Sequence, residues 1–313
     1  MLAYATRRIL ATIPVILIVA LFVFSLLYIA PGDPAAIIAG DQATPDDVER
    51  IRESLGLDRP FVIRFFDWLF AVLQGDLGNS IFTNLPVSHM ISQRIEPTLS
   101  LMVLTLTLSL SFAIPMGVIA AWKHGTLIDR AVMMTAVLGF STPVFVIGYL
   151  LAFEFALQLD WLPVQGFTSI SKGLGPFLRN LILPSVALGL VYMALIARIT
   201  RATMLDVLSQ DYVRTAKAKG VGQRGILFLH ALKNAAVPIV TIVGIGFAAL
   251  IGGAVVTESV FAIPGLGRLT VDAILRRDYP VIQGVVLLFS FIYVVVNLIV
   301  DLLYTVFDPR IRY

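Results

Sequence analysis

Long apolar runs alternate with shorter polar stretches along the whole chain. A helix that crosses the hydrocarbon core of a membrane needs about 20 mostly apolar residues. Six runs meet this requirement, at 9–30, 98–121, 131–157, 181–200, 235–257 and 281–307. The first run follows Arg7 and Arg8 and is too long for the apolar part of a signal peptide, so we predict a retained anchor. The pattern predicts an all-α membrane protein with six transmembrane helices.

The composition supports membrane integration and excludes several other classes of protein. Only 14% of the residues are charged, against about 25% in soluble domains. Hydrophobic residues make up 58%, and the mean hydropathy is +0.91. The absence of cysteine leaves no disulfide framework and no thiolate metal site or nucleophile. A net charge of +3 is too small to indicate a nucleic-acid-binding protein.

The distribution of Lys and Arg predicts the orientation, because these residues are enriched in cytoplasmic segments. With the N-terminus inside, the inner segments hold 13 of the 23 basic residues and four acids, a net charge of +9. The long outer segment 31–97 holds ten acids and five bases, a net charge of −5. Both termini are therefore predicted to be cytoplasmic.

The outer segment 31–97 is long enough to contain helices of its own. Pro45 has the position of a first helical residue, and Gly56 can end that helix. After Pro60, a strongly aromatic stretch predicts a second helix that ends at Gly75. A helix of this kind lies in the membrane interface or packs on the transmembrane bundle, and the sequence leaves both arrangements open.

Small residues and prolines within the spans predict how the helices pack. The span 235–257 is rich in Gly and Ala, which let helices approach closely where apolar surface gives no driving force for association. We also expect Pro115, Pro143 and Pro184 to interrupt their helices, as membrane proteins tolerate.

Three polar side chains within the spans are candidate functional sites, because polar and ionisable groups are costly in a membrane. Glu154 lies near the outer end of its span, and Asn297 and Asp301 lie near the inner end of theirs. Structural roles stay open, since Glu154 can reach the interface and Asp301 can pair with a cytoplasmic-side arginine. So few ionisable groups argue against a proton-coupled mechanism.

The sequence contains no pattern that indicates catalysis or a bound cofactor. His89, His124 and His230 are far apart and lack the spacing of metal-binding motifs. Gly265 and Gly267 form a lone G-x-G without the phosphate-binding G-x-x-x-x-G-K-[ST] pattern, and no G-x-S-x-G occurs. We therefore predict no enzymatic activity, no metal and no cofactor, and no means of hydrolysing ATP within this chain.

A charged island at 211–234 separates two of the apolar runs. It carries five basic residues against one acid. Because glycine is unfavourable inside a helix, the island predicts a short helix over 211–219, a turn at Gly220 and an apolar-faced piece over 226–229. Its predicted cytoplasmic position and its lack of catalytic groups indicate a surface that binds another protein.

This island resembles the cytoplasmic EAA-type loop of bacterial ABC importer permeases, in which a glycine follows Glu-Ala-Ala after three residues. Aligned on Gly220, the triplet falls on Arg214, Thr215 and Ala216, of which only the alanine matches. YVRTAKAKG, and Leu232 followed by lysine, are instead similar to the dipeptide/oligopeptide/nickel (DppB/OppB-type) subfamily. Further motifs of that subfamily are APGDP at 30–34, LGLDRP at 55–60, GDLGNS at 75–80, ESVFAIPGLGR and RDYPVIQG within 258–284, and NLIVDLLYTVFDPRIR at 297–312.

The resemblance covers nearly the whole chain and implies a permease of type I ABC importer architecture in the bacterial inner membrane. Such a subunit pairs with a second, homologous permease and binds two cytoplasmic ATPase subunits, and a periplasmic binding protein delivers the substrate. The resemblance places the ATPase-coupling loop at 203–234, with Arg214, Thr215, Ala216, Gly220 and Leu232 as its key residues. A possible gate or docking site for the binding protein comprises Glu258, Pro264, Gly265, Gly267, Arg268 and Asp278.

The expected organisation is an N-terminal anchor with a periplasmic segment (1–97), a transmembrane core (98–307) and a cytoplasmic tail (308–313). We predict a permease subunit that translocates di- and oligopeptides, with small residues of 235–257 and the Pro143 region lining the pathway. Nickel, glutathione or another small solute are alternatives within the family. The alternatives from other classes are an ion-coupled transporter or channel that works without ATPases, and a membrane scaffold.

Overall fold

The computed structural model describes residues 2–29, 34–39, 44–54 and 56–307. The expected tail 308–313 and most of the APGDP motif lie outside the described residues. The described chain is almost entirely helical, which confirms the predicted all-α class. It divides into two compact units. Unit 1 comprises Met1–Thr6, Ile95–Arg268 and Val295–Tyr313, and unit 2 comprises Arg7–Arg94 and Leu269–Val294.

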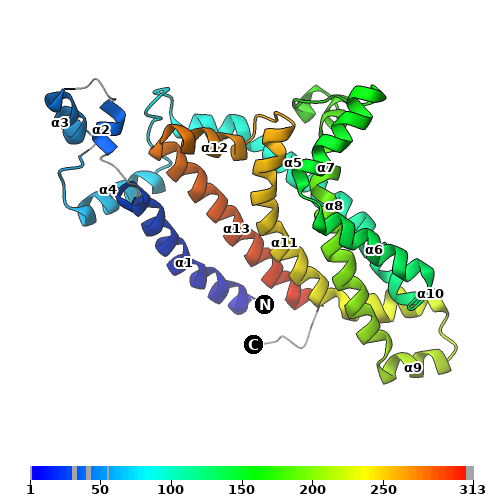
Figure 1. Ribbon diagram of the computed structural model, residues 1–313. Coiled ribbons are helices and arrows are strands. Elements are labelled where there is room, and N and C mark those ends of the chain that lie inside the picture. The colour runs from blue at the N-terminus through cyan, green and yellow to red at the C-terminus, as the bar shows by residue number, and fades with distance from the viewer. Residues whose placement is uncertain (1, 30–33, 40–43, 55, 308–313) are drawn as a thin grey trace. The chain divides into compact units, whose positions relative to one another are not determined.

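Figure 1 labels the helices in chain order. Those that lie mainly in unit 1 are α5 (Val87–Trp122), α6 (Leu127–Ser141), α7 (Val144–Leu151), the π-helix η1 (Ala152–Gln158), the short 3₁₀-helix η2 (Ile170–Lys172), α8 (Leu174–Leu208), α9 (Asp211–Ala218), α10 (Gln223–Gly225), the π-helix η3 (Ile226–Leu232) and α11 (Lys233–Val260). Those that lie mainly in unit 2 are α1 (Leu2–Ile29), α2 (Pro34–Ala39), α3 (Pro45–Ser54), α4 (Phe61–Leu73), α12 (Leu266–Arg276) and α13 (Tyr279–Phe307).

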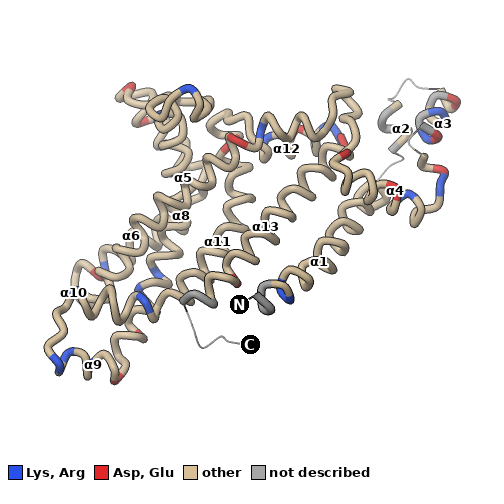
Figure 2. Tube along the Cα trace, turned by 180° about the vertical axis from the view of Figure 1, so that it is seen from behind, with Lys and Arg blue, Asp and Glu red and all other residues tan. Residues whose placement is uncertain are grey.

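Five continuous helical stretches of the described chain are long and apolar enough to cross a membrane. They are Thr6–Ile29, Val87–Trp122, Leu174–Leu208, Gln223–Val260 and Tyr279–Tyr304. A sixth candidate is the pair Leu127–Ser141 and Val144–Gln158. The predicted number of six spans is reached when this bent pair counts as one span. Charged residues lie at helix ends and in connections, and the middles of α11 and α13 carry none (Figure 2).

The predicted span 131–157 is not one straight helix, because its two halves meet at an angle of 102°. The first half ends at Ser141, and Thr142 is extended, with φ −92° and ψ 126°. A residue that precedes a proline disfavours the helical conformation, and the second half restarts directly after Pro143. The proline therefore interrupts this span as expected.

The other two prolines do not interrupt their helices, which corrects the prediction. Pro115 lies inside α5 and Pro184 lies inside α8. A proline within a helix removes one backbone hydrogen bond, but the helix continues where packed neighbours hold it in place. Pro184 is buried. Of these three prolines, only Pro143 follows a residue with an extended backbone, namely Thr142.

Several helices extend beyond the apolar runs that predicted them. α5 begins at Val87 rather than 98, and α8 covers Leu174–Leu208 rather than 181–200. Hydropathy finds only the part of a helix that matches the hydrocarbon core, so polar turns at either end are missed. The stretch between the last two spans also contains a helix, α12, which the pattern of apolar runs does not predict.

The two helices predicted in the outer segment are present. α3 covers Pro45–Ser54, and Gly56 follows it with φ +60°. α4 covers Phe61–Leu73, and Gly75 follows it with φ +86°. Both glycines have a left-handed backbone that side chains disfavour, which is why the helices end there.

α8 is the helix around which unit 1 packs, and it contacts α6, α7 and α11. Glycines allow this close approach. A Cβ atom added at Gly117 of α5 would lie 2.6 Å from Cβ of Thr200, and one at Gly253 of α11 would lie 2.6 Å from Leu188. Gly139 of α6 similarly faces the backbone of Leu190. Small residues at helix crossings therefore set the spacing in this unit.

The close helix approach predicted for the glycine-rich span 235–257 occurs at only some of its glycines. Gly244 packs against Val300 of α13, and Gly246 packs against Tyr192 of α8. At Gly252, by contrast, an added Cβ would have no described atom within 4 Å. The close approach is therefore a property of selected positions and not of the whole span.

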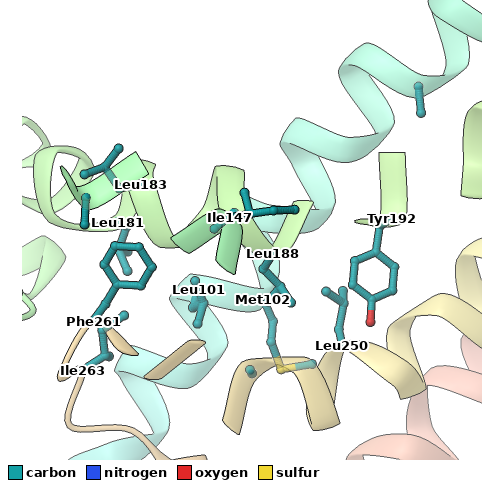
Figure 3. Packing of buried hydrophobic residues seen from close by; sticks show 14 of the residues in the cluster. Leu101, Met102, Ile147, Leu181, Leu183, Leu188, Tyr192, Leu250, Phe261 and Ile263 are labelled. Atoms are coloured by element: carbon teal, nitrogen blue, oxygen red, sulfur yellow. The ribbon is translucent and has the colours of Figure 1, made fainter. Parts of the chain in front are cut away.

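A hydrophobic cluster fills the space between these helices. Figure 3 shows its members pointing toward one another from α5, α7, α8, α11 and the segment that follows α11. Its largest fully buried side chains include Leu101, Leu181, Leu188, Leu250 and Ile263. Burial on this scale makes unit 1 a packed body and not a loose set of spans.

An ion pair that the sequence analysis did not predict joins α6 to α8. The guanidinium of Arg201 donates from Nε to Oδ1 of Asp129 at 2.5 Å and from Nη2 to Oδ2 at 2.8 Å. The Gly125 backbone N–H donates to the same carboxylate at 3.0 Å, and the ring of His124 lies 3.2 Å from it. Asp129 is buried and Arg201 is partly exposed. This bidentate ion pair holds the start of α6 against α8.

Asp129→Asn should destabilise the protein, because it leaves the Arg201 guanidinium without its charged partner. The expected loss is about 3 kcal/mol in the free energy of unfolding, measured by thermal unfolding of the purified protein in detergent. Asp206→Asn, at an exposed acid of α8, the helix that carries Arg201, is the matched control and should unfold like the wild type. Equal unfolding temperatures for the two variants would contradict this role of the ion pair.

Candidate functional site

The candidate coupling segment follows α8 directly and begins with α9 (Figure 1). Asp211 in the first turn interacts favourably with the positive end of the helix dipole. Val213 and Ala216, three positions apart, are buried on one face of α9. The rest of the helix surface is exposed and includes Arg214 and Lys217. α9 is therefore held by a small apolar face and presents a basic one.

Gly220 ends α9 with a hydrogen-bond pattern specific to helix C-termini. The Gly220 N–H donates to the Lys217 carbonyl at 3.0 Å, and the Val221 N–H donates to the Ala216 carbonyl at 3.2 Å. This pair of bonds is the Schellman motif, which needs a left-handed residue, and Gly220 has φ +80°. The structure confirms the predicted helix, the turn at Gly220 and the helical piece over 226–229.

The second half of the segment anchors it to unit 1. Ile226, Leu227 and Ala231 of η3 are buried. Leu227 and Ala231 share a hydrophobic cluster with Met204 at the end of α8, and Leu232 packs against that cluster. η3 continues without a break into α11, so Gln223–Val260 forms one helical run of 38 residues. The segment is thus connected to α8 and α11 through packed side chains.

The exposed surface of the segment combines charge with apolar side chains. Tyr212, Phe228 and Leu229 are exposed, at 44%, 56% and 71%. Burial of part of the phenol raises the pKa of Tyr212 above its ordinary value. Arg214 makes an exposed ion pair with Asp211 at 3.3 Å, and Thr215 donates to the Asp211 carbonyl. A surface of this composition suits a protein partner and not a small ligand.

A buried carboxylate organises the other end of unit 1. Glu258, at the end of α11, is fully buried. Its Oε1 accepts from the Thr98 hydroxyl at 2.6 Å, and its Oε2 accepts from the Arg268 N–H at 3.0 Å. The Thr98 hydroxyl in turn accepts from the Leu266 N–H at 2.8 Å. The network ties α5, α11 and the first turn of α12 together.

Two glycines make room for this carboxylate. A Cβ added at Gly265 would collide with the carboxylate of Glu258, and one at Gly267 would lie 2.6 Å from the Cα atom of Val255. The sequence PGLGR thus wraps around a buried acid, with glycine at the two positions of closest approach. Nothing in the sequence indicates that Glu258 contacts Thr98, because the two residues are 160 positions apart.

The residues of the expected gate or docking site differ in their exposure. Glu258, Gly265 and Gly267 are buried and do not contribute to the exposed surface of the chain. Pro264 and Arg268 are exposed and remain candidates. Asp278 is also buried but belongs to unit 2, where it accepts from the Ser80 hydroxyl at 2.5 Å and from the Ile81 N–H at 3.2 Å.

The candidate intramembrane residues lie on two different helices. Glu154 is exposed within the π-helix η1, and Asn297 and Asp301 are half-buried on α13. Among the described residues, no group of three or more His, Asp or Glu side chains could hold a metal ion. Asn297 and Asp301 are four positions apart and therefore lie on the same face of α13.

Two family models together match nearly all of the chain. Residues 113–313 match the model described as "Binding-protein-dependent transport system inner membrane component". Residues 1–110 match the model for the N-terminal part of such membrane components.

Relatives of high identity align along the full length. The chain is 56% identical over 310 residues to a probable peptide ABC transporter permease protein of Sinorhizobium fredii, with 99% of each chain covered. It is 45% identical over 313 residues to a putative peptide transport system permease protein of Brucella abortus, with full coverage of both. It is 44% identical, again with full coverage, to a glutathione transport system permease protein of Salmonella choleraesuis.

The fold is similar to that of a solved ABC transporter. The inward-facing MetNI methionine ABC transporter contains a chain that matches with a TM-score of 0.58 and 16% identity. The match covers 70% of this chain and 96% of that one. This likeness supports the architecture predicted from the sequence.

Glu258→Gln should lower stability, because an amide keeps the shape of the carboxylate but sets an NH₂ group against a backbone or hydroxyl donor. The expected cost is about 1–3 kcal/mol in the free energy of unfolding, measured by thermal unfolding. Glu154→Gln, at an exposed position, should have little effect. Thr98→Val breaks the same network, so the double variant should cost less than the sum of the two single variants. Strict additivity would show that the two side chains act independently.

Proposed function

This chain belongs to the family of binding-protein-dependent transport system inner membrane components, and we propose that the substrate it translocates is a peptide. It is a permease subunit of an ABC importer and a multi-pass protein of the inner membrane, and the ATPase is a separate chain. The observation that carries the peptide assignment is full-length identity of 56% and 45% to relatives named as peptide permeases.

We propose that the segment 203–234 binds an ATPase subunit. Its exposed basic face and the apolar side chains of Phe228 and Leu229 offer the mixture of charge and apolar area found in protein interfaces. Its buried face is packed on the ends of α8 and α11. A displacement of α9 by the ATPase would therefore reach two membrane helices through side chains already in contact.

A second, homologous permease is the proposed partner within the membrane. α6, α7 and η1 expose several large apolar side chains, among them Leu138, Phe140, Tyr149 and Phe153. Lipid or another helix must cover such a surface, and the bend at Pro143 divides it into two differently directed parts. We propose that the second permease covers part of it and that the translocation pathway lies between the two subunits.

The proposed domain organisation and the remaining partners follow from the same assignment as an importer permease. Residues 1–97 form the anchor with its periplasmic segment, and 98–307 form the transmembrane core. A periplasmic binding protein would meet the exposed Pro264 and Arg268. Two ATPase subunits would serve the pair of permeases.

Glutathione is the second candidate substrate. The specific observation in its favour is the relative of 44% identity that is named as a glutathione permease. Glutathione is itself a short peptide, so the same kind of pathway could accommodate it.

Gly220→Leu should uncouple transport from ATP while leaving the amount of protein in the membrane largely unchanged. An added Cβ meets no described atom within 4 Å, so the cost is the left-handed backbone alone, about 1–2 kcal/mol. That strain changes the direction in which α9 leaves the turn. ATP-dependent uptake into membrane vesicles and co-purification of the ATPases measure the effect.

Gly222→Leu is the matched control for this experiment. This position has equally open space but an ordinary φ of −63°, so uptake should stay near the wild-type rate. Normal ATP-dependent uptake by Gly220→Leu would refute the coupling assignment.

Deletion of this permease should abolish the uptake of labelled dipeptides and tripeptides supplied to the bacterium. The test compares dipeptide, glutathione and nickel uptake in the deletion strain with and without a plasmid copy of the gene. Loss of glutathione uptake alone would replace the peptide assignment with the second candidate. Normal uptake of both peptide and glutathione would refute both.

A further inference from the structure

Unit 2 contains a helix that is attached by aromatic rings to the end of a membrane span. The rings of Phe61, Phe65 and Trp68 on α4 lie 5.3–5.6 Å from the ring of Phe24 on α1. Tyr28 adds a ring contact of 5.0 Å with Phe61. α1 is a candidate membrane span, and these contacts lie at the end that charge counting predicts to be outside. α4 is thus positioned at the outer boundary of the membrane.

The rest of α4 remains exposed and apolar. None of its thirteen residues, all of which the structure describes, is buried. Val62, Phe66, Phe70 and Leu73 are between 55% and 75% exposed. An aromatic-rich helix with an apolar face and a location at the end of a span is typical of a helix that lies in the membrane interface.

A cavity of about 500 Å³ lies beside α4, within unit 2. This size is in the range of small-ligand sites. The aromatic side chains of Phe24, Trp68 and Tyr279 contribute to its wall. Two cations and two anions also line it, namely Arg59, Arg64, Glu53 and Asp67.

These charges are available to a ligand. The Arg59–Asp67 pair is separated by 3.4 Å, and its side chains are 62% and 63% exposed, so the pair is weak and easily displaced. Arg64 donates to the Tyr28 hydroxyl and lies 5.3 Å from the centre of that ring. A guanidinium has five N–H donors, so Arg64 retains donors for an anion while the rings hold its position.

We infer that this cavity binds the headgroup of phosphatidylethanolamine from the outer leaflet. The phosphate would accept from Arg59 and Arg64, and the ammonium group would donate to Asp67 and Glu53. The acyl chains would extend along the exposed apolar face of α4. A zwitterionic headgroup matches a site with equal numbers of opposite charges better than an anionic lipid does.

A short peptide carries the same two charged groups and is the competing occupant. The apolar face of α4 and its attachment to a membrane span favour the lipid, because a free peptide in the periplasm has no acyl chains to cover that face. The proposal does not depend on which solute the transporter imports, so it can fail or succeed independently of the peptide assignment.

Native mass spectrometry of the full chain, purified with its transporter partners, tests the proposal. The protein is exchanged into detergent that contains equal amounts of phosphatidylethanolamine, phosphatidylglycerol and phosphatidylcholine. Phosphatidylethanolamine should be retained in preference to the other two, because glycerol has no ammonium group and choline cannot donate hydrogen bonds. Equal retention of the three lipids would overturn the proposal.

Two variants with matched controls identify the site. Arg59→Gln should lower phosphatidylethanolamine retention about tenfold, the size expected for loss of a charge-assisted hydrogen bond. Asp67→Asn should shift the preference toward phosphatidylglycerol, since it leaves a net positive site. The controls Arg50→Gln and Asp58→Asn carry the same charge changes at exposed positions outside the cavity lining and should retain lipid like the wild type.

Two further outcomes, besides equal retention of the three lipids, would overturn the inference. If the controls lose lipid as strongly as Arg59→Gln and Asp67→Asn, binding reflects general surface charge and not this cavity. If an excess of dialanine displaces phosphatidylethanolamine, the cavity is a peptide site. Retention that depends on Arg59 and Asp67 and resists dialanine supports the lipid site.

Discussion

The close approach of α8 to its neighbours is the constraint on which unit 1 depends. In a membrane, apolar surface gives little drive for helices to associate, so van der Waals contact at short distance must hold them. Gly117, Gly139 and Gly253 permit that contact with α8 at three crossings. Larger residues there would separate the helices and loosen the hydrophobic cluster between them. Packing of this kind makes α8 the fixed reference for the coupling segment that follows it.

Polar networks fix unit 1 at two of its helix ends. Asp129 and Arg201 join α6 to α8, whereas Glu258 and Thr98 join α11 to α5. Each network buries a carboxylate and satisfies it with hydrogen bonds, because an unsatisfied buried charge would be strongly destabilising. Apolar packing sets the spacing of the helices, and these networks set their relative rotation and register.

Local rules predicted much of this structure, and contacts between distant residues account for what they missed. The apolar runs predicted the spans, and the conformational freedom of glycine predicted the helix end at Gly220. Proline was a less certain guide, because Pro143 breaks a helix while Pro184 is accommodated within one. The burial of Glu258 could not be predicted, because its partner, Thr98, is 160 positions away. Burial of that kind depends on the fold and leaves no periodic signal in the sequence.

The unbroken helical run from the coupling segment to the far end of α11 has a mechanical consequence. A helix of 38 residues is about 57 Å long at 1.5 Å per residue. Its inner part contains the π-helix η3 and Pro238, and both features are common positions for a helix to bend. Glu258 lies near that far end. A displacement that is transmitted along the run therefore reaches the hydrogen bonds that hold the outer turn.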